Sequence, residues 1–423
     1  MLKINEYNFS SLYDIASGIS TSKSQAGHGN PFVSFSTVFN NYFLPDELND
    51  LMNTSEKEQN TYSIKTGDIL LTRTSETVDE LAMSCVALKD YPNATFSGFT
   101  KRLRPKPGVD KIAYHKYLGF YLRSYLFRKA VTNHSIMTLR SSFNEEIFSL
   151  LNIYLPEYKE QVNTGDFLYT INQKIKLNNE INAELEKLAK TLYNYWFVQF
   201  DFPNAKGKPY RASGGEMEYS EVLKREIPKG WEIDVIKNIT DIVLGGTPDT
   251  KNKEYWGNEY NWLNSGEIAN FPIITSELMI TQHGINNSAA RLMPDGTTVI
   301  SITGNIRASI LGIQSCANKS VVGVYENDLL KCSFFYPLFS NMLRSYTAIS
   351  TGNCQTHINK GAIENTFISI PTESIIKKYN VFLSPIYKKI INVALESKQL
   401  IELRDFLLPL LMNGQVKVNK REK

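Results

Sequence analysis

Apolar residues recur at intervals of three and four over a long stretch in the middle of the chain. In order, the positions on this spacing are Leu168, Ile171, Ile175, Asn178, Asn182, Leu185, Ala189, Leu192 and Trp196. Residues three and four apart lie on one face of an α-helix, so the pattern predicts one long helix over residues 156–200. The two asparagines put polar groups in the middle of this apolar face.

The same pattern returns near the end of the chain. Moving the first stretch forward by 215 residues places it on the second without a gap. The matching positions are Leu383, Ile386, Ile390, Val393, Ser397, Leu400, Arg404, Leu407 and Leu411. A second long helix is therefore predicted over residues 371–416, and Ser397 and Arg404 again make its apolar face polar in places. Polar residues in such a seam cost stability but fix register and the choice of partner helix.

The length of the two helices indicates how they pack. At about 1.5 Å per residue each spans roughly 55–65 Å, which is more than one globular domain of ordinary size can cover. We therefore expect the two helices to pair as an antiparallel coiled coil. The alternative is that each helix packs only on its own neighbouring domain.

The remainder of the chain is also duplicated. In residues 1–155, short β-like runs such as Phe32–Phe35 and Ile69–Thr72 alternate with turn signals, and Val109–Ala130 has helical spacing. Residues 228–370 repeat this plan, because Gly67-Asp68-Ile69-Leu70-Leu71 is echoed by Gly296-Thr297-Thr298-Val299-Ile300. The predicted fold class is α+β, with two mixed globular domains in a tandem pseudo-repeat, separated by the two helices. The expected divisions are 1–155 for the first domain, 156–200 for the central helix, 201–227 for a linker, 228–370 for the second domain and 371–416 for the distal helix.

Composition narrows the class of protein only slightly. The 423 residues are 42% hydrophobic and 21% charged, and the formal net charge of +3 neither requires nor excludes a nucleic-acid partner. The opening residues, MLKINEYNFS, contain no apolar signal region, and apolar stretches such as Phe406–Met412 are too short to span a bilayer. A cytoplasmic protein is expected. The four cysteines form no CxxC pair, which favours buried thiols over a metal site.

Motifs for catalysis are missing from the sequence. There is no GxxxxGK[ST] phosphate loop, no GxGxxG and no nucleophile–base pair among the scattered histidines. The stretch Gly29-Asn30-Pro31-Phe32 comes close to the Asn-Pro-Pro-aromatic loop of adenine methyltransferases, but it lacks the second proline and is interpreted as a turn before a strand. The chain is therefore predicted to have no catalytic residue, no metal ligand and no cofactor of its own.

Polar and basic side chains gather beside the predicted turns, where loops of the two domains fall at matching points. Reading DNA requires donors and acceptors aimed at base edges, with cations and amides holding the phosphates. The candidate DNA-binding residues are Ser20, Lys23, Arg73, Ser75, Glu76, Ser97, Lys101, Arg102, Arg140, Thr247, Lys251, Lys253, Asn264, Ser265, Thr303, Arg307, Asn318, Lys319 and Gln355. Arg73 and Arg307 both follow the strand after the glycine turn. For each residue singly, a place in a solvated loop is the alternative.

Four segments carry a resemblance to a known family. They are FDFPNAKGKPYRASGGEMEYSEVLKREIPKGW (200–231), GGTPDTKNKEYWGNEYNWLNSGEI (245–268), CANKSVVGV (316–324) and FVSFSTVFNN (32–41). The chain resembles the specificity subunit of type I restriction–modification systems over essentially its whole length. The resemblance implies a bacterial or archaeal protein in which each domain is a target recognition domain for one half of a split, asymmetric double-stranded DNA sequence.

The resemblance also implies partners. The two helices would set the gap between the half-sites and dock two methyltransferase subunits, through helices that carry Ile171, Ile175, Leu185, Leu192, Ile386, Ile390, Leu400 and Leu407. S-adenosylmethionine, ATP and magnesium would belong to those methyltransferases and to separate restriction/translocase subunits. Two alternatives remain open: a specificity subunit of a related system that cuts on both sides of its site, and a coiled-coil scaffold that binds no DNA.

Overall fold

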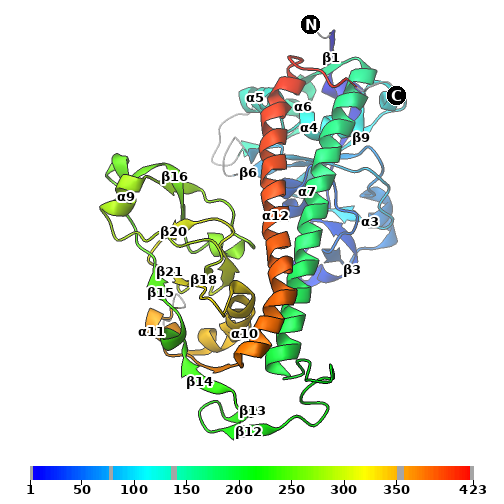
Figure 1. Ribbon diagram of the computed structural model, residues 1–423. Helices are drawn as coiled ribbons and strands as arrows, with labels where there is room; N and C mark the ends of the chain where they lie inside the picture. The colour runs from blue at the N-terminus through cyan, green and yellow to red at the C-terminus, as the bar shows by residue number, and fades with distance from the viewer. Residues whose placement is uncertain (1–2, 76–79, 135–140, 350–356, 420–423) are drawn as a thin grey trace. The chain divides into compact units, whose positions relative to one another are not determined.

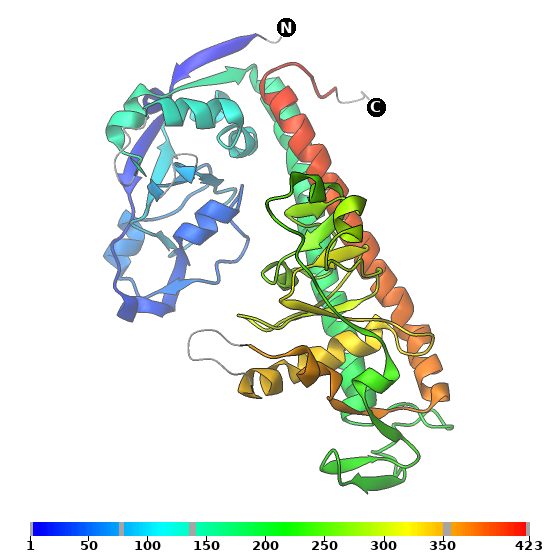
Figure 2. The ribbon, with the colours of Figure 1, turned by 90° about the vertical axis from the view of Figure 1, so that its left-hand side faces the viewer.

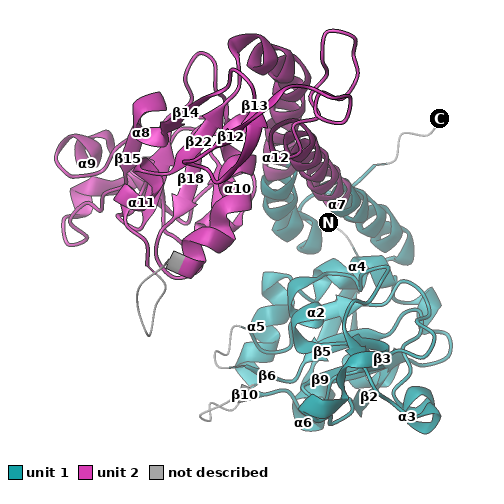
Figure 3. Ribbon diagram, turned by 90° about the horizontal axis from the view of Figure 1, so that it is seen from below, with its two compact units in different colours: residues 1–175, 400–423 teal, residues 176–399 magenta. Residues whose placement is uncertain are grey.

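The computed structural model describes residues 3–75, 80–134, 141–349 and 357–419. The chain divides into two compact units, residues 1–175 with 400–423, and residues 176–399 (Figure 3). Each unit holds one globular copy of the repeat and part of each long helix. The first copy runs from strand β1 to strand β11, and the second copy runs from β14 to β22.

The first copy is built from short strands and short helices. Its strands are β1 (Ile4–Asn8), β2 (Tyr13–Ser17), β3 (Ala26–Val33), β4 (Leu51–Met52), β5 (Ile69–Thr72), β6 (Thr74–Ser75), β7 (Ser84–Val86), β8 (Thr95–Phe96), β9 (Thr100–Pro105), β10 (Ser141–Ser142) and β11 (Asn152–Pro156). Its helical segments are α1 (Phe9–Leu12), η1 (Lys23–Gln25), α2 (Phe35–Asn40), α3 (Glu56–Thr61), η3 (Val109–Lys111), α4 (His115–Tyr121), α5 (Tyr125–His134) and α6 (Glu145–Leu150). Figure 2 shows α4–α6 beside the β1–β11 ribbon.

Strand β5 lies at the centre of the first copy. It belongs to a four-stranded antiparallel sheet of order β2-β9-β5-β7, and a three-stranded sheet of order β4-β3-β8 contains a parallel β3–β8 pair. Every residue of β5 is buried, because side chains alternate between the faces of a strand and both faces are covered. Ile69 and Leu71 enter one hydrophobic core, and Leu70 enters another.

The second copy uses a similar set of elements. Its strands are β14 (Glu232–Val235), β15 (Ile242–Leu244), β16 (Trp256–Leu263), β17 (Leu278–Ile280), β18 (Thr298–Ser301), β19 (Ala308–Ile310), β20 (Ser315–Ala317), β21 (Val321–Val324) and β22 (Phe367–Ile370). Its helical segments are α8 (Ile236–Ile239), η5 (Lys253–Tyr255), η6 (Glu267–Ala269), α9 (Gln282–Asn286), α10 (Cys332–Ile349) and α11 (Lys360–Glu364).

Strand order confirms the predicted repeat. The second copy has a four-stranded sheet β15-β21-β18-β19, a three-stranded sheet β17-β16-β20 and a ribbon β14-β22, each matching its counterpart in the first copy. The parallel pair is kept as well, now between β16 and β20. Gly67 and Gly296 stand before the two central strands at φ values of 85° and 80°, a backbone conformation that favours glycine.

The two long helices are α7 (Tyr158–Tyr193) and α12 (Glu373–Met412), of 36 and 40 residues, and they lie side by side (Figure 1). Within residues 176–399, the Asn178 amide donates to the Glu396 carboxylate at 2.9 Å, and the Asn182 amide donates to the Ile390 carbonyl at 3.1 Å. One residue number rises as its partner's number falls, so the pairing is antiparallel, as predicted. Both asparagines are buried in the seam, at 1% and 7% exposed.

The pairing also holds within the other unit. There the Arg404 guanidinium donates to the Asn172 side-chain oxygen at 3.3 Å and lies over the ring of Tyr42. The polar seam residues thus bind across the helix pair in both units, which fixes the register of the two helices.

The ends of the long helices complete the cores of the copies. The last turns of α12 bring Leu408, Leu411 and Met412 into the core of the first copy. The end of α7 and the π-helical stretch Asn194–Val198 bring Tyr193, Trp196 and Phe197 into the core of the second copy, beside Phe334. These two triplets are related by the same repeat as the helices. Packing against the copies therefore accompanies the pairing of the helices with each other.

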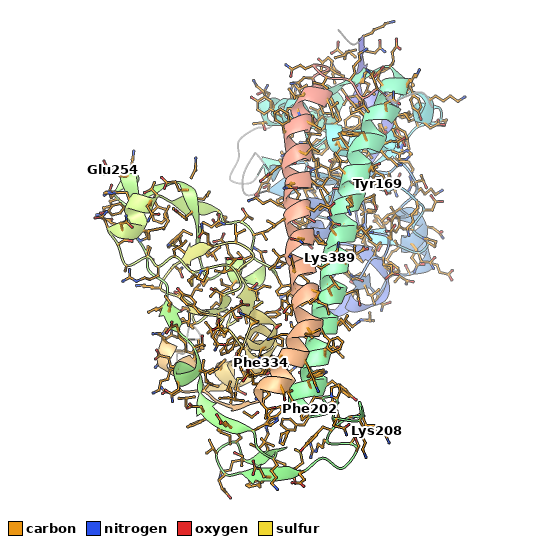
Figure 4. The ribbon with its side chains drawn as sticks, in the orientation of Figure 1. Tyr169, Phe202, Lys208, Glu254, Phe334 and Lys389 are labelled. Atoms are coloured by element: carbon orange, nitrogen blue, oxygen red, sulfur yellow. The ribbon has the colours of Figure 1, made fainter. Side chains whose placement is uncertain are left out.

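The predicted linker is ordered. It carries a hairpin of β12 (Met217–Ser220) and β13 (Arg225–Pro228), and Phe202 stacks between Tyr210 and Trp231 with ring centroids at 4.6 and 5.6 Å. Figure 4 shows Phe202 close to the lower end of α7 and Lys208 on the outer edge of this segment.

One sequence-based prediction of local structure was confirmed in outline, and another was wrong. The helical pattern over Val109–Ala130 is broken between α4 and α5, where the guanidinium of Arg123 donates to the carbonyls of residues 38, 39 and 41 at 2.8–2.9 Å. Leu126, which follows Leu118 and Leu122 at a spacing of four residues, is nevertheless exposed. By contrast, Gly29–Phe32 lies inside β3 and not before it, at an irregularity where the register with β4 shifts.

Candidate nucleic-acid interface

One end of the four-stranded sheet is closed by a tight backbone contact in the first copy. A Cβ atom on Gly18 would lie 2.1 Å from the Ser97 carbonyl oxygen, so only glycine fits between β2 and the turn that precedes β9. The Ile19 amide donates to the Phe96 carbonyl at 2.9 Å, and the Gly98 amide donates to the Ile19 carbonyl at 2.7 Å. The contact holds this turn against the end of the sheet.

We call this turn, Ser97 to Thr100, the tip turn of the first copy. Its first side chain supports it, because the Ser97 hydroxyl accepts from the Phe99 amide at 3.2 Å. The Thr100 amide donates to the Ser97 carbonyl at 2.9 Å. The Arg73 amide, just beyond β5, donates to the Phe99 carbonyl at 2.8 Å. Three separate segments of the chain therefore meet here.

The second copy builds the same turn from different residues, Asn318 to Val321. The Asn318 side-chain oxygen accepts from the Ser320 amide at 2.9 Å, and the Val321 amide donates to the Asn318 carbonyl at 3.1 Å. The Ile302 amide donates to the Ser320 carbonyl at 2.9 Å. A Cβ on Gly245 would lie 2.2 Å from the Asn318 carbonyl, as at Gly18. The tip turns are therefore equivalent residue by residue.

Cationic and hydroxyl side chains surround the first tip turn. Arg73 is exposed, with Nη1 at 3.5 Å from the Gly98 carbonyl. Lys101 is buried and its amino group donates to the Ser17 hydroxyl at 2.8 Å. Burial lowers the pKa of Lys101, and the neighbouring charge of Arg73 lowers this pKa further. Ser20 lies in the exposed loop after β2. Arg73 is thus an exposed cation beside the turn, whereas Lys101 is buried and supports the loop from beneath.

The loop between β2 and β3 in the first copy corresponds to the loop between β15 and β16 in the second copy. Lys23 opens η1 directly before β3, and Lys253 opens η5 directly before β16, so these two exposed lysines are equivalent. Figure 4 places Glu254, the next residue of η5, at the outer edge of the second copy. Thr247 and Lys251 are exposed in the same loop.

The second tip turn has its own polar surroundings. Lys319 is exposed at its second position, and Arg307 is exposed just before β19. The Thr303 hydroxyl lies 3.2 Å from Nδ1 of His357. The structure therefore brings Thr303, Arg307 and the tip turn to the same end of the β18 sheet, as in the first copy.

Arg73 and Arg307 do not occupy the same position, although both follow the central strand. The hydrogen bond from Ile302 to the second tip turn matches the one from Arg73 to the first, so Ile302 is the counterpart of Arg73. The Ser301 amide donates to the Arg307 carbonyl as the Thr72 amide donates to that of Met83. Arg307 therefore stands where the first copy has Met83.

Three predicted residues have structural contacts that account for their presence, and a fourth lies beside one of them. Arg102 donates to the Ser63 carbonyl and lies over the ring of Phe96, because its strand turns it away from Lys101 toward the other face. Asn264 caps η6 by accepting from the amides of residues 266 and 267. Ser75 is buried at 3.3 Å from the Glu80 carboxylate, and Ser265 is half-buried beside the cap.

Three predicted residues, Glu76, Arg140 and Gln355, lie outside the described residues. One residue was missed. Phe99 is the third residue of the first tip turn, and its ring is 66% exposed. Its signal in the sequence was its place directly after Gly98, within the polar and basic run Ser97–Arg102, which an interpretation by polar composition alone overlooks.

Comparison with known proteins identifies the family. The model described as type I restriction modification DNA specificity domain matches residues 5–187 and again residues 228–403. The chain belongs to this family. Its two matches coincide with the two halves of the repeat, so the chain is a DNA sequence-specificity subunit of a type I restriction–modification system, a non-catalytic class of subunit.

Two curated relatives and one solved structure agree with this assignment. The HindI specificity subunit of Haemophilus influenzae is 24% identical, over 91% of this chain and 94% of the relative. The MjaIX specificity subunit of Methanocaldococcus jannaschii is 25% identical, over 84% and 78% of the two chains. The crystal structure of a type I S subunit from M. genitalium is 11% identical with a TM-score of 0.58, covering 97% of this chain and 96% of that one, and shows the same fold.

The eight helix residues predicted for subunit docking lie on the apolar faces of the long helices, where Leu192 and Ile386 pack against the core of the second copy and Leu407 packs against that of the first. Ile171, Ile175 and Ile390 are buried, and Leu185, Leu192, Ile386, Leu400 and Leu407 are half-buried. The large apolar residues exposed on the two helices are Tyr158, Leu177, Leu188, Val381, Phe382, Ile401, Leu403 and Phe406. Leu188 and Leu403 are related by the repeat, so the same outward position is apolar in both helices.

Other types of site find little support. Cys85, Cys316 and Cys332 are buried free thiols, and burial raises the pKa of Cys85 and of Cys316 to about 12. In the described part of the chain, no three His, Cys, Asp or Glu side chains gather to hold a metal ion. None of the described helices has the length and apolar character needed to cross a membrane.

The contact at Gly245 gives a test of this geometry. Gly245→Ala places a methyl group against the Asn318 carbonyl, so we expect the free energy of unfolding to fall by about 1–3 kcal/mol, the usual cost of overpacking. Hydrogen exchange of residues 317–321 should also accelerate. Gly361→Ala, in α11 where the nearest atom is a flexible side chain, is the matched control and should change neither quantity much. Unchanged protection of the tip turn in Gly245→Ala would contradict the packing described.

Proposed function

We propose that this specificity subunit reads a DNA target in two different halves, with one copy of the repeat for each half. The observation that carries the proposal is the pair of tip turns. They share the hydrogen bond that closes the turn, the hydrogen bond that joins it to the end of the central strand, and the glycine contact. Yet one presents Gly98 and Phe99 where the other presents Lys319 and Ser320. A common framework with different side chains suits two readers of different sequences. The target is therefore asymmetric.

The segments expected from the sequence serve as recognition domains, connection and spacer. Residues 1–155 and 228–370 are the target recognition domains, and 201–227 connects them through its hairpin. Residues 156–200 and 371–416 are the spacer that sets the unread gap. Half-sites on one face of a duplex lie about 34 Å apart per helical turn, a distance within the length of these helices.

Exposed residues at the two tip turns carry the base and phosphate contacts. Arg73 and Arg307 have the fork of donors that recognises a guanine edge, and Thr303 offers a hydroxyl to either kind of base edge. Lys23, Lys251, Lys253 and Lys319 hold phosphates as point charges. The predicted residues Ser20, Ser97, Lys101, Thr247 and Asn318 shape or support the same loops.

Partner subunits dock on the outward face of the helices. Leu188 and Leu403 repeat the same apolar position, which favours two equivalent docking places and therefore two modification subunits. Those subunits bind S-adenosylmethionine and methylate adenine, and restriction subunits that use ATP and magnesium complete the system. A scaffold without DNA affinity is the second candidate. A related system that cuts on both sides of its site would need the same recognition domains.

The first test maps methylation. The chain is co-expressed with the modification subunit encoded beside it, in a host whose DNA is unmodified, and methylated adenines are mapped. They should fall in one asymmetric two-part motif with a fixed gap. Arg73→Ala should then relax one half of the motif and Arg307→Ala the other, because a bidentate base contact contributes about 1–3 kcal/mol of discrimination. Each variant is the control for the other. Equal loss at both halves, or absent methylation by a folded and assembled complex, would count against two independent readers.

The spacer has its own test. Removing residues 176–182 together with 392–398 takes one heptad from each helix at facing positions. The deletion removes Asn178 and Asn182, but a whole heptad leaves the remaining apolar positions in phase, and the Arg404–Asn172 contact across the pair is kept. Each helix shortens by roughly 10 Å, and the unread gap should shrink by about three base pairs while both half-sequences persist. The motif is again found by mapping methylated adenines. Deleting 176–182 alone, the control, should destroy the pairing; a change in the half-sequences would refute the spacer assignment.

Docking on the outward face can be tested by placing negative charges on it. Leu403 and Phe406 are 44% and 67% exposed, so Leu403→Glu with Phe406→Glu should leave the fold intact. Binding of the modification subunit should weaken at least tenfold, because burying one large apolar side chain contributes about 1.5–3 kcal/mol. Titration calorimetry or pull-down measures the loss. Leu150→Glu, at an exposed position of α6, is the control; equal binding by both variants would place docking elsewhere.

A further inference from the structure

We infer that Phe99 is a specificity-determining residue of the first copy, where its ring contacts the 5-methyl group of a thymine in the half-site. The inference rests on the proposed function and names one chemical feature of the target. It follows from what the first tip turn can and cannot offer to DNA.

The amide groups of the first tip turn are already bonded within the protein. The Gly98 amide donates to the Ile19 carbonyl at 2.7 Å, and the Thr100 amide donates to the Ser97 carbonyl at 2.9 Å. The Phe99 amide donates to the Ser97 hydroxyl at 3.2 Å. None of these three donors is left to contact a base or a phosphate.

The carbonyl groups are engaged as well. The Phe99 carbonyl accepts from the Arg73 amide at 2.8 Å, and the Thr100 carbonyl accepts from the Gly18 amide at 3.4 Å. The Gly98 carbonyl faces the Arg73 guanidinium at 3.5 Å. With its backbone occupied and Gly98 lacking a side chain, the turn presents one group outward, the phenyl ring of Phe99.

An exposed ring in this place is unfavourable unless something apolar covers it. Exposing a large apolar side chain forfeits about 1.5–3 kcal/mol relative to burying it. Among the groups that base pairs present in the major groove, the thymine methyl is the apolar one. The ring sits on a turn whose backbone is held on both sides, so contact with such a methyl costs little conformational entropy.

The second copy shows that the framework does not require the ring. Ser320 occupies the same position, with its amide and carbonyl engaged as those of Phe99 are. The turn therefore folds with a small polar residue, and the phenylalanine is a choice specific to the first copy. Ser320 offers a hydroxyl, which hydrogen-bonds to base edges and makes no methyl contact of this kind.

The test uses the full chain assembled with its modification subunits. Each thymine of the half-site read by the first copy is replaced in turn by uracil, which removes only the methyl group, and affinity is measured by fluorescence anisotropy. We expect one position to weaken binding about fourfold, the effect of one buried methyl group. Phe99→Ala and Phe99→Ser should bind the thymine and uracil duplexes equally. Leu150→Ala, a change at an exposed apolar residue of α6 outside the tip turn, should keep the wild-type ratio.

Three results would overturn the inference. One is a half-site without thymine, and another is a thymine–uracil ratio that survives in Phe99→Ala. The third is equal affinity for the thymine and uracil duplexes at every position, together with a rise in 2-aminopurine fluorescence in the half-site that requires Phe99. That result would mean that the ring inserts between bases. Wild-type protein that binds the mapped target no better than random DNA would instead refute the proposed function itself.

Discussion

The ends of the two long helices constrain everything else in this molecule. The end of α7 supplies Tyr193, Trp196 and Phe197 to the core of the second copy, and the end of α12 supplies Leu408, Leu411 and Met412 to the core of the first. These side chains are buried, so neither copy completes its core from its own strands and short helices alone. The helices therefore belong to the folding units and are more than connections between them.

The polar residues between the two helices lower the stability of the pair but fix its register. Asn178 and Asn182 each use their amide nitrogen across the pair, but their side-chain oxygens, like the Ser397 hydroxyl, have no hydrogen-bond partner among the described residues. Buried polar atoms without partners cost free energy. A slip of the helices by one turn would also strand the two amide nitrogens, which makes alternative registers worse than the native one. A spacer must have one fixed length, and a single helix register provides it.

Sequence reasoning succeeded where the physics is periodic and failed where it depends on single side chains. The seam positions and the duplication can be read from the sequence, and they predicted the helices, their antiparallel pairing and the repeated mixed domains. At the break between α4 and α5, Arg123 donates to three carbonyl groups, and no apolar pattern reveals such contacts. At the candidate interface, composition could not tell the exposed Arg73 from the inward Arg102, because strand direction decides which way each side chain points.

The difference between framework contacts and single side chains also explains how the two tip turns can carry different residues on one backbone arrangement. In each tip turn the first residue supplies a side-chain oxygen to the third amide, and a glycine on the neighbouring strand allows the close approach. These two positions carry the fold, so they are constrained. The third residue bonds only through its backbone, so phenylalanine and serine serve the turn equally well. Because the constrained atoms and the outward side chain belong to different residues, a change in what the turn presents to a partner need not disturb the sheet beneath it.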